Sequence, residues 1–256
     1  MSKGRKPEKP ISKKVQVLLK DLQRRQGVRD LEKRFLIVCE DNKSAPSYFE
    51  ALKRHLNLSA ASIRIAGSGG NTQPLQVVEE AISLKTEAAS RRSGTVPFAH
   101  VWCVIDGDYG EKIPPARAKA TADGIELAIS TKCFEYWILL HFEECDKSTM
   151  DCDGVLRNLR RRHLKNYQKG KCDFHAIVVH LDVARERAKR LRKPGISRGD
   201  LPEIQNPCSE IYRLIDAILD SRGGGNSQIP VTPTPTPRSN QPPPSGQPPV
   251  TSNAPR

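Results

Sequence analysis

The stretch Phe35-Leu-Ile-Val-Cys39, with Glu40 directly after it, decides the fold. A short, unbroken apolar run that contains Ile and Val is typical of a strand buried on both faces. Strands of this kind occur in parallel sheets whose two faces are covered by helices. The stretch therefore predicts an α/β protein with an acidic side chain at the carboxyl end of a buried strand.

After this strand, short apolar runs alternate along the sequence with segments of helical spacing. We expect helices over residues 45–56, about 75–84 and 114–122, strands over 62–66, 100–105 and 125–129, and a packed helix or strand over 134–142. Alternation of this kind predicts a mainly parallel sheet flanked by helices. Beyond residue 151 the spacing becomes helical, over 155–163, 183–191 and 209–219, and the run 177–179 is a candidate strand.

The two ends of the chain differ in composition from this body. We expect a basic, partly helical N-terminal segment (1–33), a catalytic core (34–150), an α-rich C-terminal extension (151–222) and a Pro/Thr-rich tail (223–256). The tail begins with glycines and repeats Thr-Pro and Pro-Pro, a composition that cannot form a packed core. We therefore expect the tail to be disordered.

The formal net charge of +13 is concentrated in clusters. Such clusters attract phosphate backbones or anionic lipid headgroups. No apolar stretch approaches the roughly 18 residues that span a bilayer, so nucleic acid, and not a membrane, is the expected partner. The candidate nucleic-acid-binding residues are Arg157, Arg160, Arg161, Arg162 and Lys165. The alternative is a basic, solvated surface without a specific ligand.

The seven cysteines are widely spaced and include no Cys-x-x-Cys pair. An odd number of scattered cysteines indicates reduced thiols in a cytoplasmic protein. A zinc site built from Cys145, Cys152, His141 and His163 matches no usual ligand spacing.

Three loops that follow predicted strands carry polar residues: Glu40, the glycine-rich stretch 67–72, and Asp106 with Asp108. Loops at the carboxyl ends of parallel strands gather at one edge of the sheet, where ligands bind. In extended backbone, residues two apart point to the same side, so the two aspartates can face one cation. Carboxylate oxygens suit Mg²⁺ or Mn²⁺, and Glu40 would be a further ligand or a general acid/base. Gly107, between the aspartates, would let a phosphate backbone approach closely. The alternative for this pair is a turn or a helix cap.

Two further features are weaker candidates. The glycine-rich stretch would cradle a phosphate at a helix N-terminus, or it is a tight turn capped by Asn71 or Thr72. Its candidate phosphate-binding residues are Ser68, Gly69, Gly70 and Asn71. Glu135 lies in an apolar run, where a charge is costly unless it is paired with an arginine or bound to a metal. His141, in the same run, is expected to be a core residue with its hydrogen bonds satisfied.

Taken in order, these motifs resemble the RloB-like family. They are Phe35-Leu-Ile-Val-Cys-Glu40, Pro46-Ser-Tyr-Phe49, Gly67-Ser-Gly-Gly-Asn-Thr72, Val104-Ile-Asp-Gly-Asp108, Cys133-Phe-Glu-Tyr-Trp-Ile-Leu-Leu-His-Phe142 and Asn206-Pro-Cys-Ser209. The resemblance covers about residues 34–220. It implies a Toprim-type core with its glutamate at Glu40 and its Asp-x-Asp motif at Asp106 and Asp108. It also implies a link to bacterial restriction and antiphage defence, often beside an ABC-type ATPase partner, with RNA such as tRNA favoured over DNA as substrate.

Two departures from the family pattern Glu-Gly-x-x-Thr-Glu-Pro-x-Tyr-Phe change where acidic residues stand. Asp41 replaces the glycine, and Ala45 replaces the second glutamate. If that glutamate is a metal ligand, this chain has lost it or uses Asp41 or Glu135 instead. Our leading hypothesis is a Mg²⁺-dependent Toprim endonuclease. The alternatives are a non-catalytic Toprim binding subunit of an ATPase-containing defence complex and a nucleotidyl transferase of the primase kind.

Overall fold

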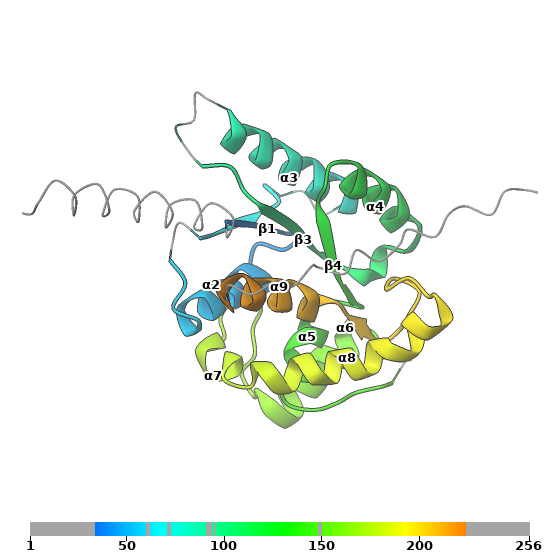
Figure 1. The fold of residues 1–256 in the computed structure, drawn as a ribbon. Coiled ribbons are helices and arrows are strands. Elements are labelled where there is room, and N and C mark those ends of the chain that lie inside the picture. The colour runs from blue at the N-terminus through cyan, green and yellow to red at the C-terminus, as the bar shows by residue number, and fades with distance from the viewer. Residues whose placement is uncertain are drawn as a thin grey trace, which may run out of the picture. The chain divides into compact units, whose positions relative to one another are not determined.

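A five-stranded sheet forms the centre of the protein in the computed structural model, which describes residues 34–59, 62–70, 73–90, 94, 96–147 and 150–223 (Figure 1). Its strands are β1 (Phe35–Cys39), β2 (Ile63–Gly67), β3 (His100–Asp106), β4 (Glu126–Thr131) and β5 (Cys208–Ser209). The order across the sheet is β2-β1-β3-β4-β5, and only β5 pairs antiparallel to its neighbour. The expectations for residues 1–33, for Asn71 and Thr72 and for the tail beyond Gly223 lie outside the described residues.

Helices cover both faces of this sheet (Figure 1). They are α2 (Ser44–His55), α3 (Pro74–Ala89), α4 (Ile113–Ala122), α5 (Phe134–Leu140), α6 (Cys152–Asn158), α7 (Phe174–Val178), α8 (Leu181–Arg198) and α9 (Ile211–Gly223), with a 3₁₀ helix η1 (Gly107–Lys112) and a π-helical turn η2 (Leu159–His163). The α3 and α4 helices pack on one face, and α2 and the helices after β4 pack on the other. The mixed α/β class, with a mostly parallel sheet and a helical C-terminal part, is confirmed and is consistent with a Toprim-like fold.

The β1 strand is buried over its whole length, as its sequence predicts. Leu36 and Val38 point into the core beneath α3 and α4. Phe35, Ile37 and Cys39 point into the larger core beneath α2, α5 and the C-terminal helices. The period-two alternation of a strand therefore supplies both cores from one apolar run.

Two elements differ from the expectations. The run 177–179, a candidate strand, begins inside α7, because Phe174 and Ile177 lie one helical turn apart and are both buried against the larger core. The β5 strand was not predicted, because two residues are too few for a periodic pattern. The C-terminal part of the chain thus contributes an edge strand to the sheet as well as helices.

Within the described part of the chain, no helix is long and apolar enough to cross a membrane. All seven cysteines are free thiols, as their spacing predicts.

Candidate active site

Glu40 lies across the carboxyl end of β3. Its backbone amide donates to the carbonyl oxygen of Val104 at 3.0 Å, which extends the β1–β3 pairing by one residue. Its carboxylate accepts two hydrogen bonds, from the amide of Asp106 to Oε2 at 2.9 Å and from the hydroxyl of Tyr109 to Oε1 at 2.6 Å. The side chain of Glu40 is therefore fixed directly beside Asp106.

Asp106 ends β3 and connects it to the helix that follows β4. Its Oδ1 accepts a hydrogen bond from the amide of Phe134, the first residue of α5, at 2.8 Å. An amide at a helix N-terminus is a favourable partner for a carboxylate. Asp106 is thereby oriented by two elements, its own strand and α5.

Asp108 does not lie on a strand with Asp106, contrary to the expectation of extended backbone over both aspartates. Extended backbone ends at Asp106, and Asp108 lies exposed in the first turn of η1. The two carboxylates nevertheless act electrostatically on the same groups, since both raise the pKa of Tyr109 and Asp108 also raises that of Glu40. The 3₁₀ turn, and not strand alternation, keeps Asp108 near the site.

Glu135 is almost completely buried, at 1% exposure, and its carboxylate has three partners. Oε1 accepts hydrogen bonds from the hydroxyls of Ser44 at 2.9 Å and Tyr167 at 3.1 Å. Oε2 lies 3.2 Å from the ammonium of Lys169. Burial alone would lower the pKa of Lys169, but the charge of Glu135 outweighs burial and raises it. The expected ion pair exists, with a lysine in place of an arginine.

Asp41 caps the N-terminus of α2. Its two carboxylate oxygens accept hydrogen bonds from the amides of Ser44 at 2.7 Å and Ala45 at 3.0 Å. The methyl group of Ala45 is buried in the larger core. Asp41 also interacts electrostatically with Glu135 and Lys169. This residue, which stands where the family pattern has glycine, therefore lies near the carboxylates, but its own carboxylate is used to cap α2.

The environment of the cluster disfavours negative charge. Burial raises the pKa of Glu40 to about 7, and the charges of Asp108 and Asp41 add to this effect against the two hydrogen bonds that the carboxylate accepts. Burial, followed by the charges of Glu40 and Glu135, raises the pKa of Asp106 well above its usual range. Carboxylates gathered in this way gain stability from a cation that neutralises them.

The amino-acid sequence matches the family model described as RloB-like protein over residues 35–218, most of the 256-residue chain. The chain belongs to the RloB-like family. No curated protein and no solved structure matches it. The family suggests a restriction-associated protein.

The glycine-rich loop of this RloB-like chain is tied to the same edge. The hydroxyl of buried Ser68 donates to the carbonyl oxygen of Glu40 at 2.9 Å. Gly69 and Gly70 have φ angles of 66° and 95°, in the left-handed region that glycine adopts at little cost. Phosphate binding by this loop stays a prediction, and the described part of the loop positions Glu40.

Close packing against Thr131 explains why position 107 is a glycine. Its place between two aspartates suggests a different explanation, the approach of a phosphate. A Cβ atom at this position would lie 2.6 Å from Oγ1 and 2.9 Å from Cα of Thr131. The glycine therefore lets the chain leaving β3 pass close to the end of β4. Packing of the strands requires it, whether or not a phosphate approaches.

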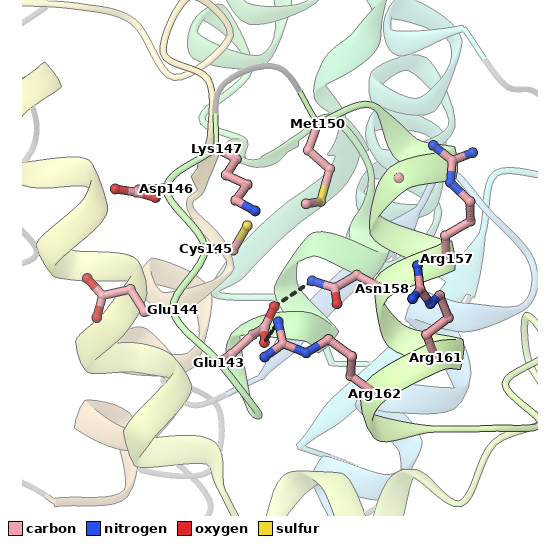
Figure 2. Close-up of a pocket in the computed structure, with 11 residues that line it drawn as sticks. Glu143, Glu144, Cys145, Asp146, Lys147, Met150, Arg157, Asn158, Arg161 and Arg162 are labelled. Carbon is pink, nitrogen blue, oxygen red and sulfur yellow. Dashed lines mark hydrogen bonds and ion pairs between the residues drawn. The ribbon is translucent and has the colours of Figure 1, made fainter.

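Four of the candidate nucleic-acid-binding residues lie on α6 and η2, and Lys165 follows them. Arg157, Arg161 and Arg162 line a cavity of about 650 Å³, whose other side is formed by the segment 143–147 (Figure 2). Arg162 pairs with Glu143 at 2.8 Å across this cavity. Arg160 does not line the cavity, and its guanidinium donates to the carbonyl oxygen of Tyr167 at 3.1 Å. Lys165 is exposed.

The four residues of the zinc site considered from the sequence do not converge. His141 is buried, with Nδ1 at 3.0 Å from the carbonyl oxygen of Trp137 and Nε2 at 3.0 Å from the hydroxyl of Tyr48. It is the satisfied core histidine that its apolar surroundings predict. His163 instead lies 3.2 Å from Glu143.

Sequence reasoning missed Tyr109, Tyr167 and Lys169 as site residues. Tyr109 directly follows Asp108, so its proximity to the acidic residues was a usable signal. Lys169 appears in the sequence only as one of many basic residues, and its pairing with Glu135 depends on the fold.

Proposed function

We propose that this RloB-like protein is a metal-dependent nuclease that hydrolyses phosphodiester bonds at the edge of the sheet marked by Glu40, Asp106 and Asp108. The observation that carries the proposal is the convergence of carboxylates from the ends of different strands, in surroundings that disfavour their charge. Hard oxygen donors of this kind fit Mg²⁺ or Mn²⁺.

Asp106 and Asp108 would hold the cation, with Glu40 as a further ligand or a general acid/base. When bound, such a cation supplies positive charge to a phosphate and lowers the pKa of water. Tyr109 holds one oxygen of Glu40, which restricts the rotation of this carboxylate. Asp41 and Glu135 are further candidate ligands of this cation. Both carboxylates already accept hydrogen bonds, which favours a role in supporting the site and not in direct coordination of Mg²⁺.

The basic residues on α6 and η2 support nucleic acid as the substrate class. Arginine side chains form charged, geometrically matched contacts with phosphates. We favour RNA such as tRNA over DNA because of the family resemblance, and the same resemblance favours a role in antiphage defence beside an ATPase partner.

The first prediction concerns the cation. The full-length protein is expected to cleave a tRNA pool or a DNA duplex only in the presence of Mg²⁺ or Mn²⁺, because the carboxylates cannot polarise a phosphate by themselves. Cleavage is measured by gel electrophoresis after dialysis against a chelator and after the cation is restored. Turnover in the chelator would contradict the proposal. Tight, metal-independent binding without any turnover would favour the non-catalytic binding subunit.

The second prediction concerns the basic surface. The double variant R157Q/R161Q is expected to bind RNA more weakly and to reduce the slope of log K against log salt concentration by about 1.4 for single-stranded RNA, because two phosphate contacts are lost. Binding is measured by fluorescence anisotropy at several salt concentrations. The charge-matched control K119Q/K189Q changes an exposed lysine on α4 and a partly exposed lysine on α8, and it should keep the wild-type slope. Equal slopes for all three proteins would show that this surface does not bind nucleic acid.

A further inference from the structure

Two cysteines and a glutamate meet beside the carboxylate cluster. The ligand atoms of Cys133, Glu135 and Cys152 all lie within 4.8 Å of one another. Cys133 and Glu135 are buried, and Cys152 is partly exposed. The three side chains come from the loop after β4, the first turn of α5 and the first residue of α6. Separate chain segments thus bring two thiols and one carboxylate to a single point.

We propose that Cys133, Cys152 and Glu135 form a second cation site, selective for a thiophilic divalent metal of the zinc class. Zinc takes thiolate and carboxylate ligands in a tetrahedron, in which neighbouring sulfur ligands lie about 3.7 Å apart. The spread of these three ligand atoms requires only a small contraction to reach that geometry. Mg²⁺ does not take thiolates, so the site differs in metal class from the one proposed at Asp106.

The carboxylate of Glu135 offers one oxygen for this purpose. Oε1 is already occupied by the hydroxyls of Ser44 and Tyr167. Oε2 is buried and, among the described residues, accepts no hydrogen bond; its one neighbour of opposite charge is the ammonium of Lys169, at 3.2 Å. The side chain of Lys169 is 40% exposed, so it can turn toward solvent when a divalent cation replaces its charge. Buried Oε2 is therefore the third ligand.

Metal binding at this site exchanges only protons and water with the solvent. Each thiol releases a proton to solvent as its sulfur–metal bond forms, and the carboxylate contributes one oxygen. One solvent molecule completes four-coordination, and the partly exposed Cys152 marks the side from which the metal enters. Such a site would join the start of α5 to the start of α6, across the chain segment that separates these helices. This inference does not depend on the nuclease activity.

The full-length protein, purified under reducing conditions and stripped of metal, is titrated with Zn²⁺ against a chromogenic chelator. A parallel titration with Co²⁺ follows the near-ultraviolet thiolate-to-cobalt charge-transfer band. We expect about one equivalent of tightly bound metal and a clear thiolate band. The variants C133S, C152S and E135Q should each bind zinc at least ~100-fold more weakly, since loss of a direct ligand exceeds the effect of losing a supporting group.

Two control variants test whether a loss of zinc binding is specific to the three proposed ligands. C172S changes a partly exposed cysteine outside the cluster and should bind zinc like the wild type. D106N should also keep its zinc even if it loses Mg²⁺-dependent cleavage, which distinguishes failure of this inference from failure of the proposed function. Because Cys133 is buried and its variant risks misfolding, C152S decides the question. Equal zinc binding by C152S and the wild type, the absence of a thiolate band, or a Cys133–Cys152 disulfide in place of metal would overturn the proposal.

Discussion

The variant D106N is expected to cleave nucleic acid about a thousandfold more slowly than the wild type while keeping its fold. Loss of a cation ligand removes several kcal/mol of stabilisation from the charge that develops on the phosphate, and each ~1.4 kcal/mol corresponds to a factor of ten in rate. The amide oxygen of asparagine can still accept the hydrogen bond that Asp106 accepts from Phe134. Single-turnover cleavage at saturating protein measures the chemical step directly.

The same variant should be at least as stable as the wild type in metal-free buffer. The surroundings of Asp106 raise its pKa through burial and through the charges of Glu40 and Glu135, so the fold stabilises its neutral form. A neutral amide at this position removes that repulsion. Active sites commonly trade stability for function in this way. Thermal unfolding in a chelator and again in Mg²⁺ measures the stability of the variant and the wild type without and with the cation.

The matched control is D123N, which changes an aspartate at the end of α4 that pairs with Lys119 at 3.1 Å. It should cleave at the wild-type rate. A D106N protein that is folded and cleaves at the rate of D123N would refute the assignment of Asp106. A D106N protein that is unfolded would contradict the stability argument, and E40Q would then test the site independently.

The sequence predicts the location of the carboxylate cluster because a local rule governs it. Continuous apolar runs mark buried strands, and parallel strands bring their carboxyl ends to one edge. Glu40 and Asp106 follow from that rule alone. The sequence singles out Glu135 for a different reason, which is its charge within an apolar run.

The partners of Glu135 do not follow from any local rule. Ser44 is 91 residues away in the sequence, and Tyr167 is 32 residues away on the far side of α6. Which residues meet at such distances depends on how helices of irregular length pack on the sheet. For the same reason no spacing in the sequence indicates that Cys152 lies beside Cys133.

Local packing also gives a structural task to two positions that the sequence links to phosphate. Gly107 lies between two aspartates, and Ser68 lies in a glycine-rich loop, so both look like phosphate-binding positions. The fold uses Gly107 to let β3 approach Thr131, and it uses the hydroxyl of Ser68 to hold the backbone of Glu40. Residue type and spacing limit what a position can do, but its neighbours decide which of those tasks it performs.

His141 is expected to make the protein less stable in mild acid. Its Nδ1 donates to the carbonyl oxygen of Trp137, so in the neutral ring Nε2 accepts from the hydroxyl of Tyr48. Burial lowers the pKa of His141 to about 4, against its ordinary value of 6.5. Between these two values the unfolded chain binds a proton that the folded protein does not. Stability therefore falls as the pH drops from about 6.5 toward 4, by up to about 3 kcal/mol.

The variant H141Q isolates this effect, because glutamine has similar hydrogen-bonding groups and does not titrate. The raised pKa values of Glu40 and Asp106 act in the opposite direction, since protonation of those carboxylates stabilises the fold as the pH falls. The informative quantity is therefore the difference between wild type and H141Q in the free energy of unfolding, measured by urea titration at pH 7.5 and pH 4.5. H141Q should be the less stable protein at the higher pH and should lose less stability on acidification. Parallel pH profiles for the two proteins would show that His141 is not the buried neutral group that its contacts indicate.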